Sequence, residues 1–107
     1  MSDKYQIRIS DRANASIRGI GYYIANNLCA PGTASAVMQR IESAIMSLDQ
    51  LPNRYPLVDT DVSSQKGVRR MLVRKNYIVY YLVDNQNRIV HILAVTYARS
   101  DQTDVLP

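Results

Sequence analysis

A run of basic residues in one short segment is the feature of this sequence with the clearest capacity for chemistry. Between Val62 and Val83 the chain carries five cations and no acidic residue, namely Lys66, Arg69, Arg70, Arg74 and Lys75. This local excess is larger than the net charge of +4 on the whole chain. Such a cluster attracts the phosphates of a nucleic acid or the carboxylates of an acidic partner. The alternative interpretation is an ordinary solvated hairpin with basic residues on its outer face.

Other arrangements that carry out catalysis are missing from the sequence. The single histidine, His91, and the single cysteine, Cys29, are far apart, so they form no metal cluster and only a weak nucleophile–base pair. There is no glycine-rich phosphate loop, no serine-centred catalytic turn and no prominent pair of carboxylates. We therefore expect neither a metal nor a cofactor, and we interpret His91 as a structural or surface residue.

Length and composition indicate one domain over residues 1–107. No run of about 18 apolar residues is present, so we expect no membrane span. The first residues lack the basic and then apolar pattern of a secretory signal. A lone cysteine cannot form an internal disulfide, and nothing else points to an oxidising compartment. These observations predict a cytoplasmic protein.

The first half of the chain has the periodicities of one strand and two helices. Residues 4–9 alternate between apolar and polar side chains, which predicts a strand with one buried face. Ser10-Asp11 offers an N-cap to a helix whose apolar positions are Ala13, Ile17, Ile20, Ile24 and Leu28. After a break, with Thr33 as the expected N-cap, a second apolar stripe comprises Ala34, Val37, Ile41, Ile45 and Leu48. The short link predicts that the two helices pack antiparallel.

The second half of the chain predicts a loop followed by three strands. Residues of about 52–66 contain two prolines and several polar side chains, which is typical of a loop. The strands are expected from about Val68 to Arg74, from Tyr77 to Val83 and from Ile89 to Tyr97, and a loose tail covers about 100–107. The result is an α+β fold of order β-α-α-β-β-β. A helix hairpin packs on one face of a small antiparallel sheet, whose other face stays partly open.

Several short motifs resemble the RelE/ParE superfamily of bacterial toxins, which is also described as a plasmid stabilisation family. They are Leu48-x-x-Leu51-Pro52, Gly67-x-Arg69, Asn76-Tyr77-x-Val79-x-Tyr81 and Val95-x-Tyr97-x-Arg99-x-Asp101. Their order and spacing cover nearly the whole chain, and the layout predicted from periodicity matches the fold of that superfamily. The resemblance implies the toxin of a type II toxin–antitoxin module, which inhibits growth until a cognate antitoxin binds it.

The superfamily acts on two targets, and the resemblance leaves both open. RelE-like members cut mRNA in the ribosomal A site without a metal, whereas ParE-like members poison DNA gyrase and do no chemistry of their own. For a ribonuclease, the catalytic residues implied here are Arg70, Arg74, Tyr97 and Arg99. Leu72 and Ile78, however, stand where RelE-like members often carry basic residues. The ending Tyr97-Ala98-Arg99-Ser100-Asp101 is more similar to ParE-like proteins, which favours the gyrase poison.

Two surfaces follow from this interpretation. The basic residues Lys66, Arg69, Arg70, Arg74 and Lys75 are candidates for binding the target or a nucleic acid. Ile78, Tyr80 and Leu82 share one face of a strand, and we expect them to contact the antitoxin. For Arg69 and Arg70 the alternative is plain surface charge or salt bridges to the antitoxin, and for Tyr77 and Tyr81 we expect core packing. A third possibility for the whole chain is a toxin fold that only binds its partner and has lost activity.

Overall fold

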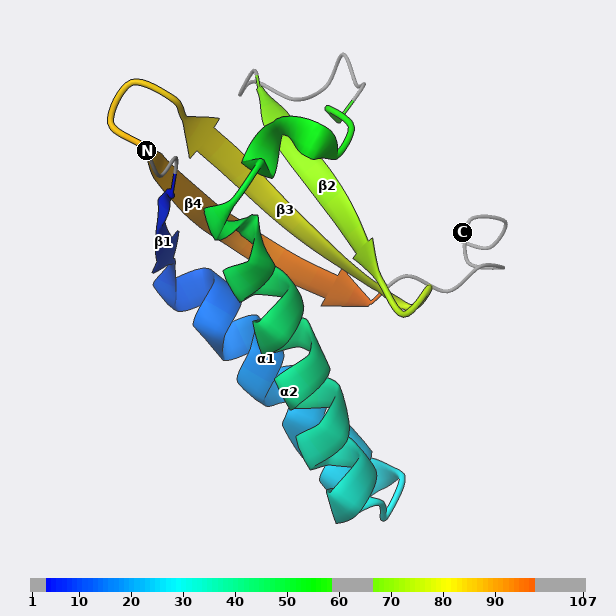
Figure 1. Cartoon of the computed structure of the whole chain (residues 1–107). Helices are drawn as coiled ribbons and strands as arrows, with labels where there is room; N and C mark the ends of the chain where they lie inside the picture. Colours follow the sequence, from blue (N-terminus) through cyan, green and yellow to red (C-terminus); the bar gives the residue numbers. More distant parts are fainter. Residues whose placement is uncertain (1–3, 59–66, 98–107) are drawn as a thin grey trace.

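The computed structural model describes residues 4–58 and 67–97. Its elements follow the predicted order β-α-α-β-β-β, which is confirmed. The helices and strands are β1 (Gln6–Ile9), α1 (Asp11–Tyr22), α2 (Pro31–Met46), β2 (Val68–Val73), β3 (Tyr77–Asp84) and β4 (Ile89–Tyr97). A π-helical turn, η1 (Tyr23–Asn27), extends α1, and two 3-10 turns, η2 (Ser47–Asp49) and η3 (Pro52–Arg54), follow α2. Figure 1 shows the helix pair extending well beyond the sheet at one end of the molecule.

The four strands form one mixed sheet in the order β1-β4-β3-β2. β3 pairs antiparallel with β2 and β4, as predicted, and β1 lies at one edge of the sheet. The pairing of β1 with β4 is parallel, so the sheet is not antiparallel throughout. Because two antiparallel helices return the chain to the end where β1 began, β2 starts there too. Two hairpins later, β4 has the same direction as β1.

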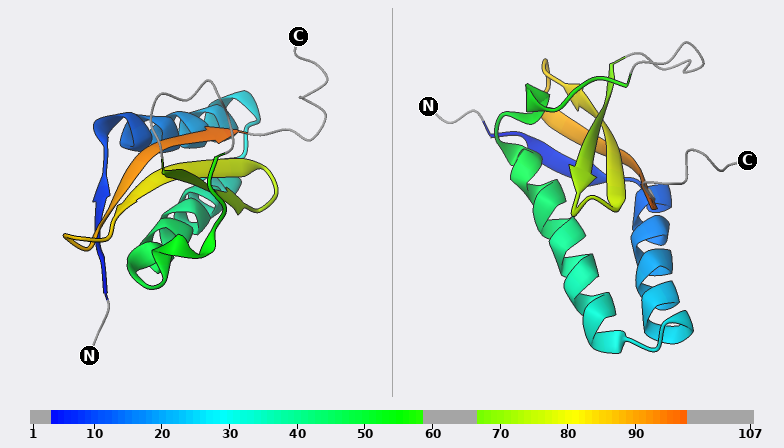
Figure 2. Two further views of the ribbon diagram at one scale, coloured as in Figure 1. Left: turned by 90° about the horizontal axis from the view of Figure 1, so that it is seen from above. Right: turned by 90° about the vertical axis from the view of Figure 1, so that its right-hand side faces the viewer.

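The two helices cover one face of the sheet and leave the other uncovered (Figure 2). The core between them has a helix side and a sheet side. The helix side consists of residues such as Ile17, Ile41, Ile45 and Leu48, and the sheet side of Met71, Val79, Tyr81, Val90 and Ile92. In the described part of the chain no charged side chain is buried, and the buried side chains with a polar group are the tyrosines Tyr77 and Tyr81. Burying apolar area of this kind is the main stabilising contribution to such a fold.

The two helices begin in different ways. Ser10 caps α1 as predicted, because its Oγ accepts a hydrogen bond from the Ala13 amide at 3.0 Å. The same hydroxyl donates to the Leu93 carbonyl at 3.1 Å, which ties the helix to β4. α2 begins at Pro31, and Thr33 lies inside its first turn instead of serving as the N-cap. Proline suits the first helical position, since its fixed φ is helical and its missing N–H would have no partner there.

The strands end at turns with unusual backbone conformations. β2 ends at Val73, and Arg74 and Lys75 form the turn with left-handed φ values of 56° and 69°. Arg74 therefore does not continue the alternation of β2, although the sequence predicted a strand to that residue. Between β3 and β4 the register shifts at Tyr80 and Tyr81, so that Leu93 is an extra residue in β4. Such a bulge increases the local twist of the sheet.

Candidate functional site

The uncovered face of the sheet carries a band of apolar side chains. Across the strands, Leu72 pairs with Ile78, Arg70 with Tyr80 and Val68 with Leu82. These positions alternate with the buried residues of β2 and β3, so their side chains lie on the face that the helices do not cover. Leu72 is 59% exposed, and Ile78, Tyr80 and Leu82 are half-buried by their neighbours. The structure thus places the three residues expected to contact an antitoxin on one accessible face.

A short extended segment covers part of the β2 edge. Leu57 forms an isolated bridge with Arg69, the Val58 amide donates to the Val68 carbonyl at 2.7 Å, and the Arg70 amide donates to the Pro56 carbonyl at 3.0 Å. The Arg69 guanidinium also donates from Nη1 to the Tyr55 carbonyl at 2.6 Å. Arg69 is half-buried, so it anchors this segment and is not a free surface cation.

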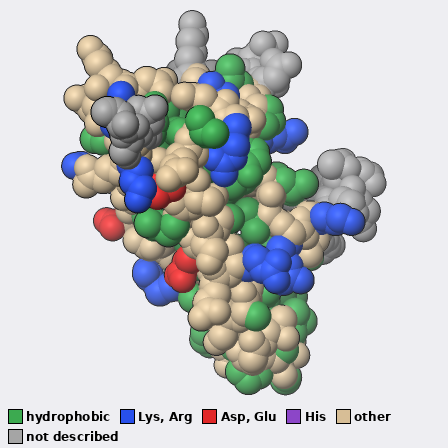
Figure 3. Space-filling model, in the orientation of Figure 1, with side chains coloured by type: hydrophobic (Ala, Val, Ile, Leu, Met, Phe, Trp, Pro, Cys, Tyr) green, Lys and Arg blue, Asp and Glu red, His purple; other side chains and the backbone are tan. Residues whose placement is uncertain are grey.

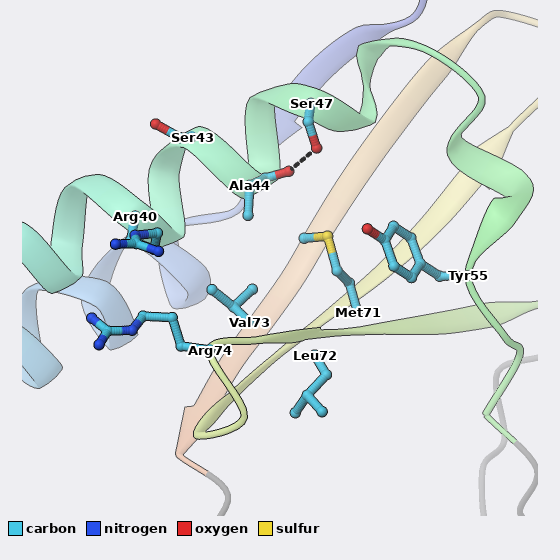
Figure 4. A pocket seen from close by; sticks show the side chains of 9 residues that line it. All are labelled: Arg40, Ser43, Ala44, Ser47, Tyr55, Met71, Leu72, Val73 and Arg74. Carbon is cyan, nitrogen blue, oxygen red and sulfur yellow. Dashed lines mark hydrogen bonds between the residues drawn. The ribbon is translucent and has the colours of Figure 1, made fainter.

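A pocket of about 420 Å³ lies between α2 and β2. Its floor is apolar, with Ala44, Met71 and Val73, and Tyr55 closes one end (Figure 4). At the other end Arg40 from α2 and Arg74 from the β2–β3 turn lie beside each other (Figure 4). No ion pair or hydrogen bond of either guanidinium is found within residues 4–58 and 67–97. The pocket therefore combines an apolar floor with two cations that can bind an anionic group.

A second pocket, of about 340 Å³, lies on the open-face side of the same edge. It is lined by Tyr55, Pro56, Arg70, Leu72 and Ile78. Tyr55 and Leu72 line both pockets, so the two hollows lie on either side of the β2 edge at Leu72. Each pocket has an arginine beside apolar side chains, which suits a partner that is both acidic and apolar.

Two buried tyrosines belong to the core, as the sequence predicted. Tyr81 donates its hydroxyl to the Pro52 carbonyl at 2.7 Å, and its burial raises the pKa of this phenol from 10.0 to about 12. Burial also raises the pKa of Tyr77, with a smaller contribution from Tyr97 and an opposing one from Arg74. The ring centroids of Tyr77 and Tyr97 are 5.4 Å apart, and the two ring planes are inclined to each other by 54°. Neither buried phenol is suited to releasing a proton near neutral pH.

The residues implied for a ribonuclease are not gathered at one point. Arg70 lies on the open face in the second pocket, whereas Arg74 lines the first pocket on the helix side. Tyr97 pairs with the buried Tyr77, so it belongs to the helix-side face, although half of its surface is exposed. Lys75 lies exposed in the β2–β3 turn. Lys66 and Arg99 lie outside the described residues.

Sequence reasoning missed Arg40 and Tyr55. Arg40 precedes the buried Ile41 on α2, and periodicity alone does not tell which flank of a helix borders a strand edge. Tyr55 falls in the segment that composition predicted to be a loop. The described residues include no group of three potential metal ligands. They also include no helix that is long and apolar enough to cross a bilayer.

Comparisons with known proteins agree on one superfamily. The family model of the ParE toxin of the type II toxin–antitoxin system parDE matches residues 7–102. A search of curated proteins finds no match. Among solved structures, the chain is similar to one from the chromosomal ParDE system of P. aeruginosa, with 19% identity, a TM-score of 0.72, and coverage of 92% of this chain and 100% of that one.

Two RelBE structures are similar at a lower TM-score. For the RelBE2 complex of Mycobacterium tuberculosis the identity is 22%, the TM-score 0.60, and the coverage 89% of this chain and 92% of that one. For the intact RelBE complex of E. coli the identity is 15%, the TM-score 0.60, and the coverage 89% and 98%. At these identities the structural likeness establishes the fold alone.

Proposed function

Because this chain belongs to the ParE toxin family of type II toxin–antitoxin modules, we propose that it arrests growth by poisoning DNA gyrase. It does so as a binding protein that traps another enzyme, in the cytoplasm and without a cofactor. A cognate antitoxin neutralises it by covering the open face of the sheet.

One observation carries the choice of a binding protein over a ribonuclease. A metal-free ribonuclease must bring a proton carrier and a cation to the same phosphate. Here the described candidates are divided between two faces: Arg70 lies on the open face, whereas Tyr97 and Arg74 lie near Tyr77 on the helix side. The residues flanking Arg70 on the open face, Leu72 and Ile78, are apolar. Such surroundings suit contact with a protein better than stabilisation of a charged transition state.

The basic residues then serve in recognition. Arg70, Arg74 and Lys75 are exposed around the β2–β3 hairpin. Exposed cations accelerate the encounter with an anionic surface even where they contribute little to the final affinity. Both a DNA-bound gyrase and an acidic antitoxin present such a surface.

Ile78, Tyr80 and Leu82 are the proposed antitoxin contacts. They are the half-buried part of an apolar band that also contains the exposed Leu72. An amphipathic helix or a strand laid across this band would bury it, in the way that peptides dock on grooves and sheet edges.

The purified toxin tests the target directly. It is incubated with gyrase, ATP and a supercoiled plasmid, and the product is treated with detergent and protease. We expect linear DNA from trapped cleavage complexes, and none when gyrase is left out. In growing cells, induction without antitoxin should stop thymidine incorporation before amino-acid incorporation.

The outcome that contradicts the proposal is a fall in protein synthesis first, with mRNA cut in the ribosomal A site. That result would indicate a ribonuclease, for which Arg70 and its cross-strand neighbour Tyr80 on the open face are the pair to examine. If strong expression harms neither process while antitoxin binding persists, the chain is a toxin fold that only binds its partner.

A further inference from the structure

The end of the helix hairpin exposes large side chains that the fold of a single chain does not use. This hairpin end comprises residues 19–39, and Figure 1 shows it well beyond the sheet. Its internal core consists of aliphatic side chains such as Ile24 and Val37. Outside this core, Tyr22 is 69% exposed, Leu28 56% and Tyr23 53%. Neither tyrosine hydroxyl has a hydrogen bond within residues 4–58 and 67–97, so these side chains are available to contact another molecule.

The hairpin end carries no charge, which limits what it can bind. Residues 19–39 include no Asp, Glu, Lys, Arg or His, and the face in Figure 3 shows this end without blue or red. A nucleic acid needs cations for its phosphates, and helices that lie on a lipid surface also carry Lys or Arg on their polar face. An acidic protein is attracted instead to the basic residues of β2 and the turn after it. The partner that fits the hairpin end is therefore an uncharged protein surface.

We propose that the hairpin end binds the hairpin end of a second copy of this chain and so forms a weak homodimer. Each copy carries a net charge of +4, so two copies repel each other wherever their charged surfaces meet. Contact through the uncharged ends keeps the charges of the two sheets far apart. Because the hairpin end extends beyond the sheet, two copies can meet there without a collision between their sheets (Figures 1 and 2). A second copy also supplies the uncharged surface that the hairpin end requires.

The distribution of large and small residues on the hairpin end suits a contact with itself. The end of α1 and the start of η1 present Tyr22 and Tyr23, whereas the first half of α2 exposes the small residues Gly32, Ser35 and Ala36. A Cβ added to Gly32 would meet nothing within 4 Å, so the surface there is open. In a two-fold dimer the same patch of each copy faces the other, and the tyrosines of one copy lie on the small residues of its partner. Tyrosine suits such a contact, because its ring is apolar and its hydroxyl is polar.

The expected dimer is weak and leaves the sheet uncovered. The exposed apolar side chains contribute roughly 300–400 Å² per copy, about half of what each partner contributes to a stable interface. We therefore expect a dissociation constant on the order of 10–100 µM. The open face of the sheet stays accessible in both copies, so the dimer can hold two antitoxins or two target molecules (Figures 1 and 2). This dimer surface is separate from the surfaces proposed above, so it does not depend on which target the toxin has.

Sedimentation equilibrium of the purified toxin tests for the dimer. As the protein concentration rises through the micromolar range, the mass should shift reversibly from that of one chain to that of two. Raising the salt concentration should strengthen the association, because salt screens the repulsion between two positively charged copies. A contact between opposite charges would respond in the other direction. The mass of a single chain up to about 1 mM, or a dimer that dissociates in salt, would overturn the proposal.

Paired substitutions locate the contact, measured at high salt where long-range repulsion is screened. Tyr22→Lys, Tyr23→Lys places two cations on the hairpin end and should raise the dissociation constant of the dimer by about tenfold or more. Leu57→Lys, Leu72→Lys is the matched control, because it adds the same charge by replacing two side chains that are also more than half exposed, but beside and on β2. We expect the control to change the dissociation constant by less than about twofold. If the control dissociates the dimer and the tyrosine variant does not, or if neither does, the contact is not at the hairpin end and the proposal is wrong.

Cys29 reports on the contact even if the tyrosine variant fails to fold. It is the single cysteine of the chain, it is exposed, and it lies between η1 and α2 at the hairpin end. A short bis-maleimide, which reacts with one thiol at each of its ends, should join two wild-type copies. In Cys29→Ser, Gln86→Cys the exposed thiol lies in the β3–β4 turn, away from the hairpin end, and we expect about tenfold less cross-linked dimer. Equal yields from the two proteins, or none from the wild type, would overturn the proposal.

Discussion

At the scale of single residues, Tyr81 shows how one buried hydroxyl links the loop to the sheet. It is fully buried in β3, and its hydroxyl donates to the Pro52 carbonyl in η3. We expect Tyr81→Phe to lower the free energy of unfolding at neutral pH by about 1 kcal/mol, because the buried carbonyl loses its donor. Urea unfolding followed by circular dichroism measures this change.

The same residue predicts how stability falls in alkali. The pKa of Tyr81 is raised in the folded protein to about 12, against 10.0 for a free tyrosine. The stabilisation from keeping this phenol neutral is therefore complete below pH 10 and is lost as the pH rises towards 12. Over that range wild-type stability should fall by roughly 1–3 kcal/mol from this group. The fall should be shallower in Tyr81→Phe, and Tyr22→Phe, which alters an exposed ring, is the control. Equal slopes in all three proteins would contradict the assignment.

Arg70, Arg74 and Arg40 show what residue-level reading of the sequence can and cannot provide. The predicted strand contains Arg70, which lies on the face opposite the buried Met71 and Val73. The prediction extended the strand to Arg74, but a left-handed turn conformation ends it one residue earlier. Arg40 could not be found at all, since its role depends on which flank of α2 borders β2. Periodicity within one helix or strand therefore cannot identify a site that is assembled from residues of separate elements.

At the scale of elements, the two glycines of α1 differ in how closely they pack against other residues. A Cβ on Gly21 would contact the Met38 side chain of α2, whereas one on Gly19 would meet nothing within 4 Å. We expect Gly19→Ala to stabilise the protein by about 0.5–1 kcal/mol through helix propensity. Gly21→Ala should destabilise it by about 1 kcal/mol, because the helices approach closely at that point. Urea unfolding of both variants measures whether each substitution raises or lowers the free energy of unfolding.

Met38 provides the control for this pair. In a Met38→Ala background the contact is gone, so adding Gly21→Ala should cost nothing further or stabilise the helix. A loss of the same size in both backgrounds would show that Gly21 is required for another reason. Close packing against α2 therefore explains the glycine at position 21 and not the one at position 19.

The elements that the sequence predicted best are those whose pattern is local. The bounds of β2, β3 and β4 were predicted to within one residue, because each strand buries alternate side chains on one face. The parallel pairing of β1 with β4 depends on the path of the whole chain, and no local pattern encodes it. The π-helical turn η1 was not predicted either. It widens the end of α1 through a hydrogen bond from the Leu28 amide to the Tyr23 carbonyl at 3.3 Å.

At the scale of the whole molecule, charge is distributed unevenly between two ends. Residues 19–39, which form the end of the helix hairpin, include no charged side chain, and Figure 3 shows that end without blue or red. The densest group of basic residues is in β2 and the turn that follows it, which carry Arg69, Arg70, Arg74 and Lys75. An anionic partner is therefore attracted to the sheet end of the molecule. There it meets the apolar open face of the sheet.

This arrangement predicts how a single new charge affects the antitoxin complex. Ile78→Lys places a cation in the middle of the apolar band, where antitoxin binding would have to desolvate it. We expect the affinity for the antitoxin to fall by about 1–3 kcal/mol, measured by titration calorimetry, and the free toxin to become more soluble. Gln6→Lys adds the same charge at the far edge of the sheet, where the residue is exposed and pairs only with β4.

The two variants have the same net charge, one unit more positive than the wild type, so long-range attraction to an acidic antitoxin strengthens by a similar amount in both. Any difference between them must come from contact with the apolar band. If both gain affinity alike, electrostatic attraction to the basic end dominates and Ile78 is not a contact. If neither changes, the antitoxin binds elsewhere on the toxin. Thermal unfolding of both variants should match that of the wild type, because neither side chain is part of the core between the helices and the sheet.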